Sequence, residues 1–245
     1  MNGWPDADTL HLVTDRLNAL RAEIDQTCHR VGRDPAEVTL VGACKRQPLS
    51  RIAAAVVAGL NELGENYVQE TESVRPALEA LLKERGVRPP RWRMIGHLQR
   101  NKARDAVNRF DTIDSIDRIK LAVELNKRSE AEGRTLDVGF QIALSAEEQK
   151  AGIRPEEAPA LLDACRPLES LRVIGLMTLP SAEPKQARIA FRRLRELRDT
   201  LQQKAGGESL QQLSMGMSGD FKIAIEEGAT HVRIGSALFG DRTPR

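Results

Sequence analysis

Residues 213–240, LSMGMSGDFKIAIEEGATHVRIGSALFG, carry the pattern that decides the fold. An apolar run ends in a glycine-bearing loop, residues 219–227 form an amphipathic segment, and a second apolar run follows. Short strands joined through a helix are typical of a parallel pair, because parallel strands need a long crossover connection. The segment therefore predicts a β-α-β unit.

The same alternation recurs along the chain. Apolar runs predict eight strands, VTLVGAC, NELGEN, RWRMIGHL, FDTIDSI, LDVGFQIAL, LRVIGLMTL, LQQLSMGMS and THVRIGSALFG. Helical periodicity predicts the connections, at residues 50–60, 67–85, 101–108, 117–132, 155–165, 184–204 and 219–227. An additional helix over residues 8–31 precedes the first strand and carries one apolar face: Leu10, Val13, Leu17, Leu20 and Ile24.

Strands that alternate with helices in a chain of 245 residues match a closed barrel better than an open, doubly wound sheet. No linker rich in glycine, serine or proline divides the sequence. We therefore predict an α/β fold, a single (β/α)8 TIM barrel with an extra N-terminal helix, forming one domain over residues 1–245.

Composition excludes several classes of function. The net charge is +2 and aromatic residues make up 3% of the chain, which argues against a nucleic-acid-binding protein. No apolar run is long enough for a membrane span and no signal peptide is evident, so we expect a cytoplasmic protein. Cys28, Cys44 and Cys165 lack paired spacing, which predicts reduced thiols without a metal site. Cys44, beside Lys45, is either a reactive thiol or a small buried residue of the strand, and we predict the structural role.

Lys45 stands directly after the first apolar run, at the tip of a strand that is expected to be buried. Active sites of TIM barrels lie at the carboxyl ends of the strands. A charged amine is costly to desolvate, so Lys45 either extends to water or is a reactive amine at the mouth of a pocket.

The loops after the last two strands carry glycine and serine, at Ser218, Gly235 and Ser236. Loops at these places commonly bind phosphate in barrel enzymes, because glycine lets backbone amides approach an anion. Residues 218–220 also read as the N-cap of the following helix, a role that is compatible with phosphate binding.

Closure of the barrel places strand eight beside strand one, so Lys45 and the predicted phosphate site face one pocket. An amine and a phosphate grip suit a phosphorylated aldehyde, and pyridoxal 5'-phosphate (PLP), a vitamin B6 cofactor, fits both through a Schiff base to the lysine. From spacing alone, a lysine that extends to water remains the alternative.

The runs LVGACKRQP, LGENYVQE, WRMIGHLQRNK, GLMTLP and the stretch 213–240 resemble the YggS/PROSC family of pyridoxal phosphate homeostasis proteins. The resemblance extends from the first helix to Gly240, with the motifs in matching order. It implies a barrel similar to the N-terminal domain of alanine racemase, which binds PLP covalently.

The resemblance also implies roles for individual residues. Lys45 occupies the position of the Schiff-base lysine, and Ser218, Gly235 and Ser236 match the phosphate-binding positions. Arg233 would approach the pyridine nitrogen. The remaining predicted cofactor-binding residues line the floor or the mouth of the pocket: Met215 with Met217, Asn66 and His97.

Some positions depart from the family pattern. Many relatives carry Ser-Lys-Thr or a similar triplet where this chain has Cys44-Lys45-Arg46, and many have asparagine at the position of Ala143. The usual pair of aspartates after the phosphate serine is replaced by Gly219 and Asp220. The lysine and the predicted cradle remain, so the departures concern pocket polarity and ligand exchange.

A racemase needs two acid/base groups on opposite faces of its substrate. Lys45 supplies one, whereas in alanine racemase the second is a tyrosine from an additional domain, for which this chain has no residues left. We therefore predict a non-catalytic PLP-binding protein of PLP homeostasis, a monomer that buffers the cofactor or delivers it to apo PLP-dependent enzymes. A PLP-dependent racemase and a Schiff-base aldolase that uses Lys45 without cofactor are the alternatives.

Overall fold

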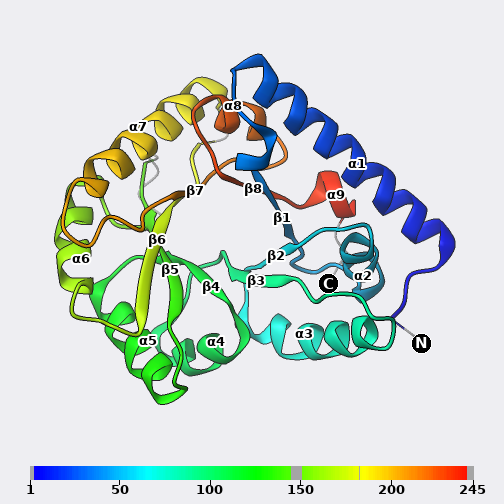
Figure 1. Ribbon diagram of the computed structural model, residues 1–245, viewed down its shortest axis with the longest axis horizontal. Coiled ribbons are helices and arrows are strands. Elements are labelled where there is room, and N and C mark those ends of the chain that lie inside the picture. Colours follow the sequence, from blue (N-terminus) through cyan, green and yellow to red (C-terminus); the bar gives the residue numbers. More distant parts are fainter. Residues whose placement is uncertain (1–2, 145–150, 182, 242–245) are drawn as a thin grey trace.

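The strands form a closed parallel barrel in chain order, in which β8 pairs with β1 (Figure 1). The computed structural model describes residues 3–144, 151–181 and 183–241. The predicted TIM barrel is confirmed, and each strand lies within a run predicted above. The strands are β1 (Thr39–Ala43), β2 (Glu62–Glu65), β3 (Arg91–Met94), β4 (Thr112–Ile116), β5 (Leu136–Ile142), β6 (Leu171–Thr178), β7 (Gln212–Ser214) and β8 (His231–Ile234).

Helices surround the barrel and connect successive strands (Figure 1). They are α1 (Ala7–Arg30), α2 (Leu49–Val57), α3 (Val68–Lys83), α4 (Ala103–Arg109), α5 (Ile119–Ala131), α6 (Ala158–Cys165), α7 (Pro184–Gln202), α8 (Phe221–Glu226) and α9 (Ser236–Phe239). Short 3-10 helices at Pro35–Glu37, Arg100–Lys102 and Pro155–Glu157 precede β1, α4 and α6. Among the described helices, none has both the length and the apolarity that crossing a membrane requires.

The extra N-terminal helix α1 completes the outer ring. The helix after β8, α9, is a single turn and cannot cover the seam between β8 and β1. Helix α1 packs against α2, α8 and α9 along this side of the barrel (Figure 1). Its buried face includes Val13, Leu17, Leu20 and Ile24, as the sequence predicted.

Near the carboxyl end of the chain, one local prediction was wrong and a second was confirmed in part. The run THVRIGSALFG is not one strand, because β8 ends at Ile234 and the chain turns at Gly235 into α9, where the Phe239 N–H donates to the Gly235 carbonyl at 2.9 Å. Asp220 is the N-cap residue of α8, within the predicted segment 218–220, but its side chain accepts no hydrogen bond from the amides of the helix. Instead, Asp220 Oδ1 accepts the Met217 N–H at 2.6 Å and closes the loop before the helix.

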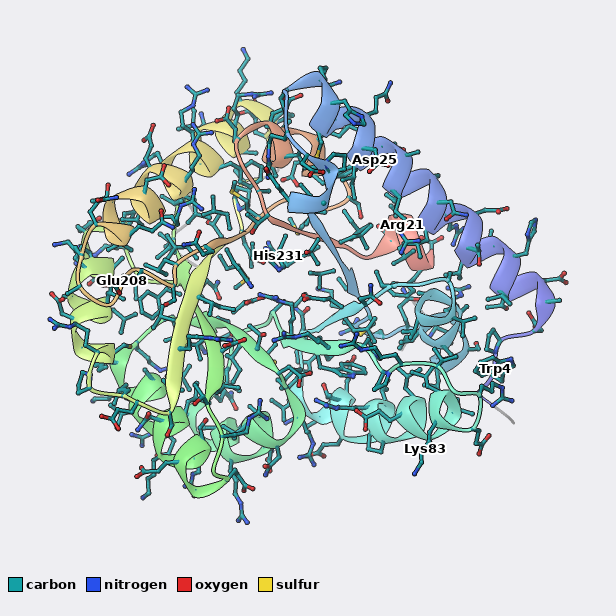
Figure 2. The ribbon with its side chains drawn as sticks, viewed as in Figure 1. Trp4, Arg21, Asp25, Lys83, Glu208 and His231 are labelled. Atoms are coloured by element: carbon teal, nitrogen blue, oxygen red, sulfur yellow. The ribbon has the colours of Figure 1, made fainter. Side chains whose placement is uncertain are left out.

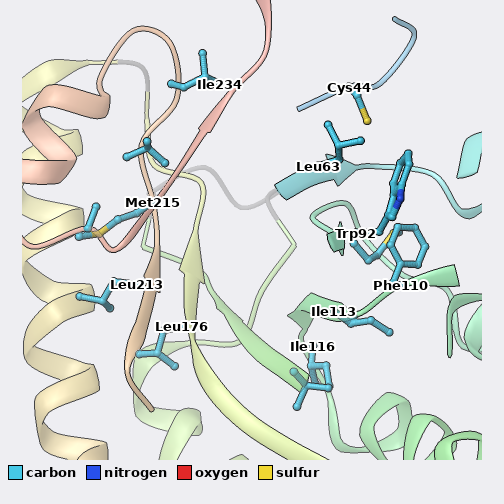
Figure 3. Packing of buried hydrophobic residues seen from close by; sticks show 14 of the residues in the cluster. Cys44, Leu63, Trp92, Phe110, Ile113, Ile116, Leu176, Leu213, Met215 and Ile234 are labelled. Atoms are coloured by element: carbon cyan, nitrogen blue, oxygen red, sulfur yellow. The ribbon is translucent and has the colours of Figure 1, made fainter. Parts of the chain in front are cut away.

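The hydrophobic core lies between the barrel and the helices. On β3, Trp92 is fully buried in this layer, near Leu63 and Cys44 (Figure 3). Its neighbour Arg93 points the other way, into the barrel, because successive strand residues alternate between faces. His231 also lies inside the ring of strands (Figure 2). The helices are therefore attached by apolar packing, while the barrel interior carries charged side chains.

Candidate functional site

A cavity of about 440 Å³ opens at the carboxyl ends of the barrel strands. This is a usual size for a small-molecule site. Loops after β1, β2, β3, β6, β7 and β8 contribute to it. Its lining residues are Ala43, Lys45, Gln47, Asn66, Ile95, Leu179, Pro180, Met217, Ser218, Gly219, Arg233, Gly235 and Ser236.

The structure brings together most of the residues that the sequence predicted for one site. Lys45 enters from the turn after β1, and Arg233 from β8. Strand pairing explains this convergence, because Val41 lies beside Arg233 and Gly42 beside Ile234, so the two strands end at the same height. The other predicted residues that line the cavity are Asn66, Met217, Ser218, Gly235 and Ser236.

His97 is not part of this cavity. It lines a neighbouring cavity of about 430 Å³ between the loops after β2 and β3, and Asn66 contributes to both. His97 Nδ1 lies 3.2 Å from an oxygen of Asp117, and the His97 side chain is 47% exposed. His97, predicted at the mouth of the pocket, therefore lines a neighbouring cavity at the same end of the barrel.

Met215 does not line the floor of the cavity either. It is fully buried in the hydrophobic core on the outer side of the barrel, near Leu213 (Figure 3). Met217 lines the cavity and is 40% exposed. The loop after β7 turns at Gly216, where φ is 92°, so the two methionines face different surroundings.

Sequence reasoning missed Gln47, Ile95, Leu179 and Pro180 as lining residues. All of them lie one to four residues beyond the end of a strand, where the barrel rule places a site. Met177 and Thr178, the last residues of β6, are buried, and the lining begins at the next residue. Position just after a strand could therefore have identified these residues, but the predicted strand boundaries were not accurate enough for this.

Backbone amides in the loops after β7 and β8 form a candidate anion cradle. In the part of the chain that the structure describes, the N–H groups of Ser218, Gly219, Ser236 and Ala237 donate to no protein acceptor. A Cβ atom at Gly219 would meet no atom within 4 Å, so this glycine borders open space. Unpaired donors beside a cavity are suited to bind a phosphate group.

Arg233 is buried at the inner end of the cavity, with 3% of its surface exposed. Its guanidinium donates to Ser214 Oγ at 2.8 Å and to the Thr178 carbonyl at 2.9 Å. Burial lowers the pKa of Arg233 to about 10, while the carboxylates of Asp114 and Asp220 oppose this shift. The side chain still carries its positive charge at neutral pH, and two neutral acceptors hold it in place.

An ionic layer lies inside the barrel. Arg93 donates to both carboxylate oxygens of Asp114, at 2.9 and 2.7 Å, and also to Glu62 at 3.0 Å and Gln212 at 2.7 Å. Burial by itself would lower the pKa of Arg93, but Asp114 and then Glu62 raise it above its ordinary value. Burial lowers the pKa of the nearby His231 to about 3, so this imidazole is neutral. Arg93, Asp114 and Glu62 therefore form a fixed network of ion pairs inside the barrel.

Cys44 and Glu65 lie behind the Lys45 turn. The Cys44 Sγ is 3.3 Å from the Gly64 carbonyl and 3.6 Å from Glu65 Oε2. Burial, followed by the charge of Glu65, raises the pKa of the Cys44 thiol well above its ordinary value. A buried thiol of this kind stays protonated and is a poor nucleophile, which favours the structural interpretation of Cys44.

Glu65 is the unusual carboxyl group of this region. It is 2% exposed, and burial raises its pKa to about 7, although the Asn66 N–H, which donates to it at 2.6 Å, opposes the shift. Because the folded-state pKa exceeds the ordinary value of 4.5, the stabilising contribution is full below that value and is lost as the pH rises through about 7.

We therefore expect Glu65→Gln to flatten the dependence of stability on pH. The glutamine can still accept the Asn66 N–H but does not ionise. Relative to the wild type, its free energy of unfolding should rise by about 3 kcal/mol between about pH 4 and pH 8. Chemical denaturation across this range measures the difference, and parallel curves for the two proteins would contradict the expectation.

The fold and the site together define a class of protein. A family model described as "Alanine racemase, N-terminal domain" matches residues 16–243. That model covers nearly the whole chain, including every strand of the barrel and every residue that lines the cavity. The chain therefore belongs to the alanine racemase N-terminal domain family.

Relatives within this family are named more specifically. The pyridoxal phosphate homeostasis protein of Pseudomonas aeruginosa is 40% identical over 232 residues, which cover 94% of this chain and 96% of the relative. The protein of the same name from Escherichia coli K12 is 38% identical, with coverage of 94% and 97%. The sequence resemblance to pyridoxal phosphate homeostasis proteins is thus confirmed.

A solved structure also resembles this chain over nearly its whole length. PipY of Synechococcus elongatus PCC7942, solved with PLP bound, superimposes with a TM-score of 0.79. It is 33% identical to this chain, and the match covers 93% of this chain and 100% of PipY.

Proposed function

We propose that this protein binds PLP without catalysing a reaction on it, holds it as a Schiff base on Lys45, and serves PLP homeostasis. The observation that carries the proposal is the shared cavity, in which a lysine from the β1 turn and the amide cradle after β7 and β8 line one space. The relatives named pyridoxal phosphate homeostasis protein and the PLP bound to PipY support the same ligand.

The residues present fit the cofactor. The amide N–H groups around Ser218 and Ser236, which have no acceptor among the described residues, suit its phosphate, and the apolar side chains of Ile95 and Leu179 suit a flat ring. When bound, PLP supplies an aldehyde whose carbon bonds to the lysine nitrogen as water leaves. The chain itself supplies the amine, the anion cradle and the buried Arg233.

Arg233 is compatible with the proposed carrier function. A guanidinium at the inner end of the pocket disfavours protonation of a pyridine ring beside it, because two positive charges would be adjacent. An unprotonated ring is the weaker electron sink, so the site binds the cofactor without promoting carbanion chemistry.

We also propose that the protein is a cytoplasmic monomer with one domain over residues 1–245 that passes PLP to apo PLP-dependent enzymes.

The test is an absorption spectrum of the purified protein with PLP, recorded before and after borohydride, followed by peptide mapping. We expect a Schiff-base band that borohydride removes and a stable adduct on Lys45. Incubation with L-alanine should leave its optical activity unchanged. A spectrum equal to the sum of the protein and free PLP would contradict the binding proposal, and steady racemisation would favour an enzyme.

The cradle has its own test. Ser236→Asp places a carboxylate at the start of α9, where it repels the phosphate dianion. We expect the PLP dissociation constant to rise by roughly thirtyfold, or about 2 kcal/mol for a partly solvated charge pair. Thr200→Asp, on the exposed end of α7, makes the same change in net charge away from the site and should bind as the wild type does. Equal affinities for all three proteins would place the phosphate elsewhere.

A further inference from the structure

The turn that carries Lys45 has an unusual backbone. Residues 44–47 follow β1, and the Gln47 N–H donates to the Cys44 carbonyl at 3.0 Å, which closes a β-turn. At the third position, Arg46 has a φ of 56°, the one positive φ among the described residues other than glycine. A negative φ at the second position and a positive φ at the third are the pattern of a type II turn.

A type II turn does not suit arginine at this position. Glycine or asparagine is preferred there, because a side chain in the left-handed region is strained. The alternative that relaxes Arg46 is a type I turn, in which the central peptide is rotated by about half a turn. In that state, the Arg46 N–H points to the opposite side of the turn.

Glu70 holds the strained state. It lies in the first turn of α3, and its Oε2 accepts the Arg46 N–H at 3.0 Å. This N–H belongs to the central peptide, so the hydrogen bond exists only while the peptide has the type II orientation. A hydrogen bond to a charged acceptor is strong enough to offset the strain of one left-handed residue.

The ends of the turn are fixed independently of the central peptide. The Cys44 N–H donates to the Gly64 carbonyl at 2.9 Å, and Gln47 Nε2 donates to the Gly240 carbonyl at 3.3 Å. The first bond anchors the turn to β2 and the second to the residue after α9. With both ends held, the central peptide that follows Lys45 is the part whose orientation depends on Glu70.

We propose that Glu70 is a positioning residue for Lys45: by binding the Arg46 N–H it locks the turn in one state and presents the Lys45 amine to the cavity. The inference rests on the proposed function, because its benefit is a lysine preorganised to bond to the cofactor aldehyde. Glu70 does not touch the reacting atoms. Its loss lets the turn sample the relaxed state and slows formation of the Schiff base.

The first measurement needs no cofactor. Amide hydrogen exchange at Arg46, followed by NMR, should be roughly tenfold faster or more in Glu70→Ala, since a charge-assisted hydrogen bond is lost. Glu70→Gln keeps an acceptor oxygen, so its exchange rate at Arg46 should lie between those of the wild type and Glu70→Ala. Glu72→Ala, on the same helix with its ion pair to Arg109, is the matched control and should match the wild type. An unchanged exchange rate at Arg46 in Glu70→Ala would overturn the proposal that Glu70 holds the turn in one state.

The second measurement is the rate of Schiff-base formation after mixing with PLP, followed by absorption. We expect Glu70→Ala to be several-fold slower, and Glu70→Ala with Arg46→Gly to return to the wild-type rate, because glycine adopts the type II turn without strain. A purely structural role of Glu70 would not be rescued by glycine, so failure of rescue or an unchanged rate overturns the proposal. If the wild type forms no Schiff base, the proposed function fails, while the exchange experiment still decides whether Glu70 locks the turn.

Discussion

Lys45→Ala is expected to abolish the Schiff-base absorption band completely. The band requires a primary amine bonded to the cofactor aldehyde, and alanine has none. Lys45 lines the cavity from the turn after β1, in the same space as the amide cradle. Noncovalent binding through the cradle should remain but weaken, because the covalent bond no longer contributes. The measurement is titration with PLP by absorption, with equilibrium dialysis for the remaining affinity.

Two further variants make the result specific. Lys45→Arg keeps the positive charge but has no nucleophilic amine at neutral pH, so it should also lack the band. Lys102→Ala removes a lysine that lines the neighbouring cavity, and this variant should keep the Schiff-base band. If Lys45→Ala retains a band that borohydride reduces, with the adduct on another lysine, the assignment of Lys45 is wrong.

Asp114→Ala should cause the largest loss of stability among single substitutions in the barrel interior. Arg93 and Asp114 form a bidentate pair in which the two side chains are 2% and 3% exposed. Removing the carboxylate leaves the buried guanidinium with Glu62 as its remaining anionic partner within hydrogen-bonding distance among the described residues. Breaking a buried pair in this way typically costs 3–5 kcal/mol, so we expect a loss of about 4 kcal/mol in the free energy of unfolding.

An exposed ion pair provides the matched control. Asp199 accepts a hydrogen bond from Arg198 at 2.6 Å, and its side chain is 54% exposed. Asp199→Ala should change the free energy of unfolding by less than about 1 kcal/mol, because solvent already screens this pair. Urea denaturation of both variants tests the contrast. Equal, small losses would mean that Arg93 finds compensation from its other partners or from water.

Local pattern was sufficient to predict the barrel. Each strand is a short apolar run and each following helix has its own periodicity, and both signals lie within the segment itself. Parallel strands with helical crossovers then leave few topologies, so closure into a barrel followed from the number and order of the segments. The predicted run THVRIGSALFG was too long because its apolar pattern continues through Gly235 into α9.

The candidate site was predicted in outline. Lys45, Ser218, Gly235 and Ser236 were identified because each follows a strand, and the carboxyl ends of barrel strands meet on one rim. His97 and Met215 follow or end strands as well, yet they face an adjacent cavity and the core. Position after a strand therefore predicts the rim on which a residue lies but not the direction of its side chain.

The sequence by itself determined the fold class, the order of the elements and the rim that carries the site, since these depend on local periodicity and on the chain order of strands. Only the tertiary structure decided that Glu70 meets the backbone of Arg46, that Glu65 is buried behind the lysine, and that Arg93 and Asp114 pair inside the barrel. The physical reason is that such contacts join residues on different strands and helices. Their geometry is set by strand register and barrel closure, which no local segment contains.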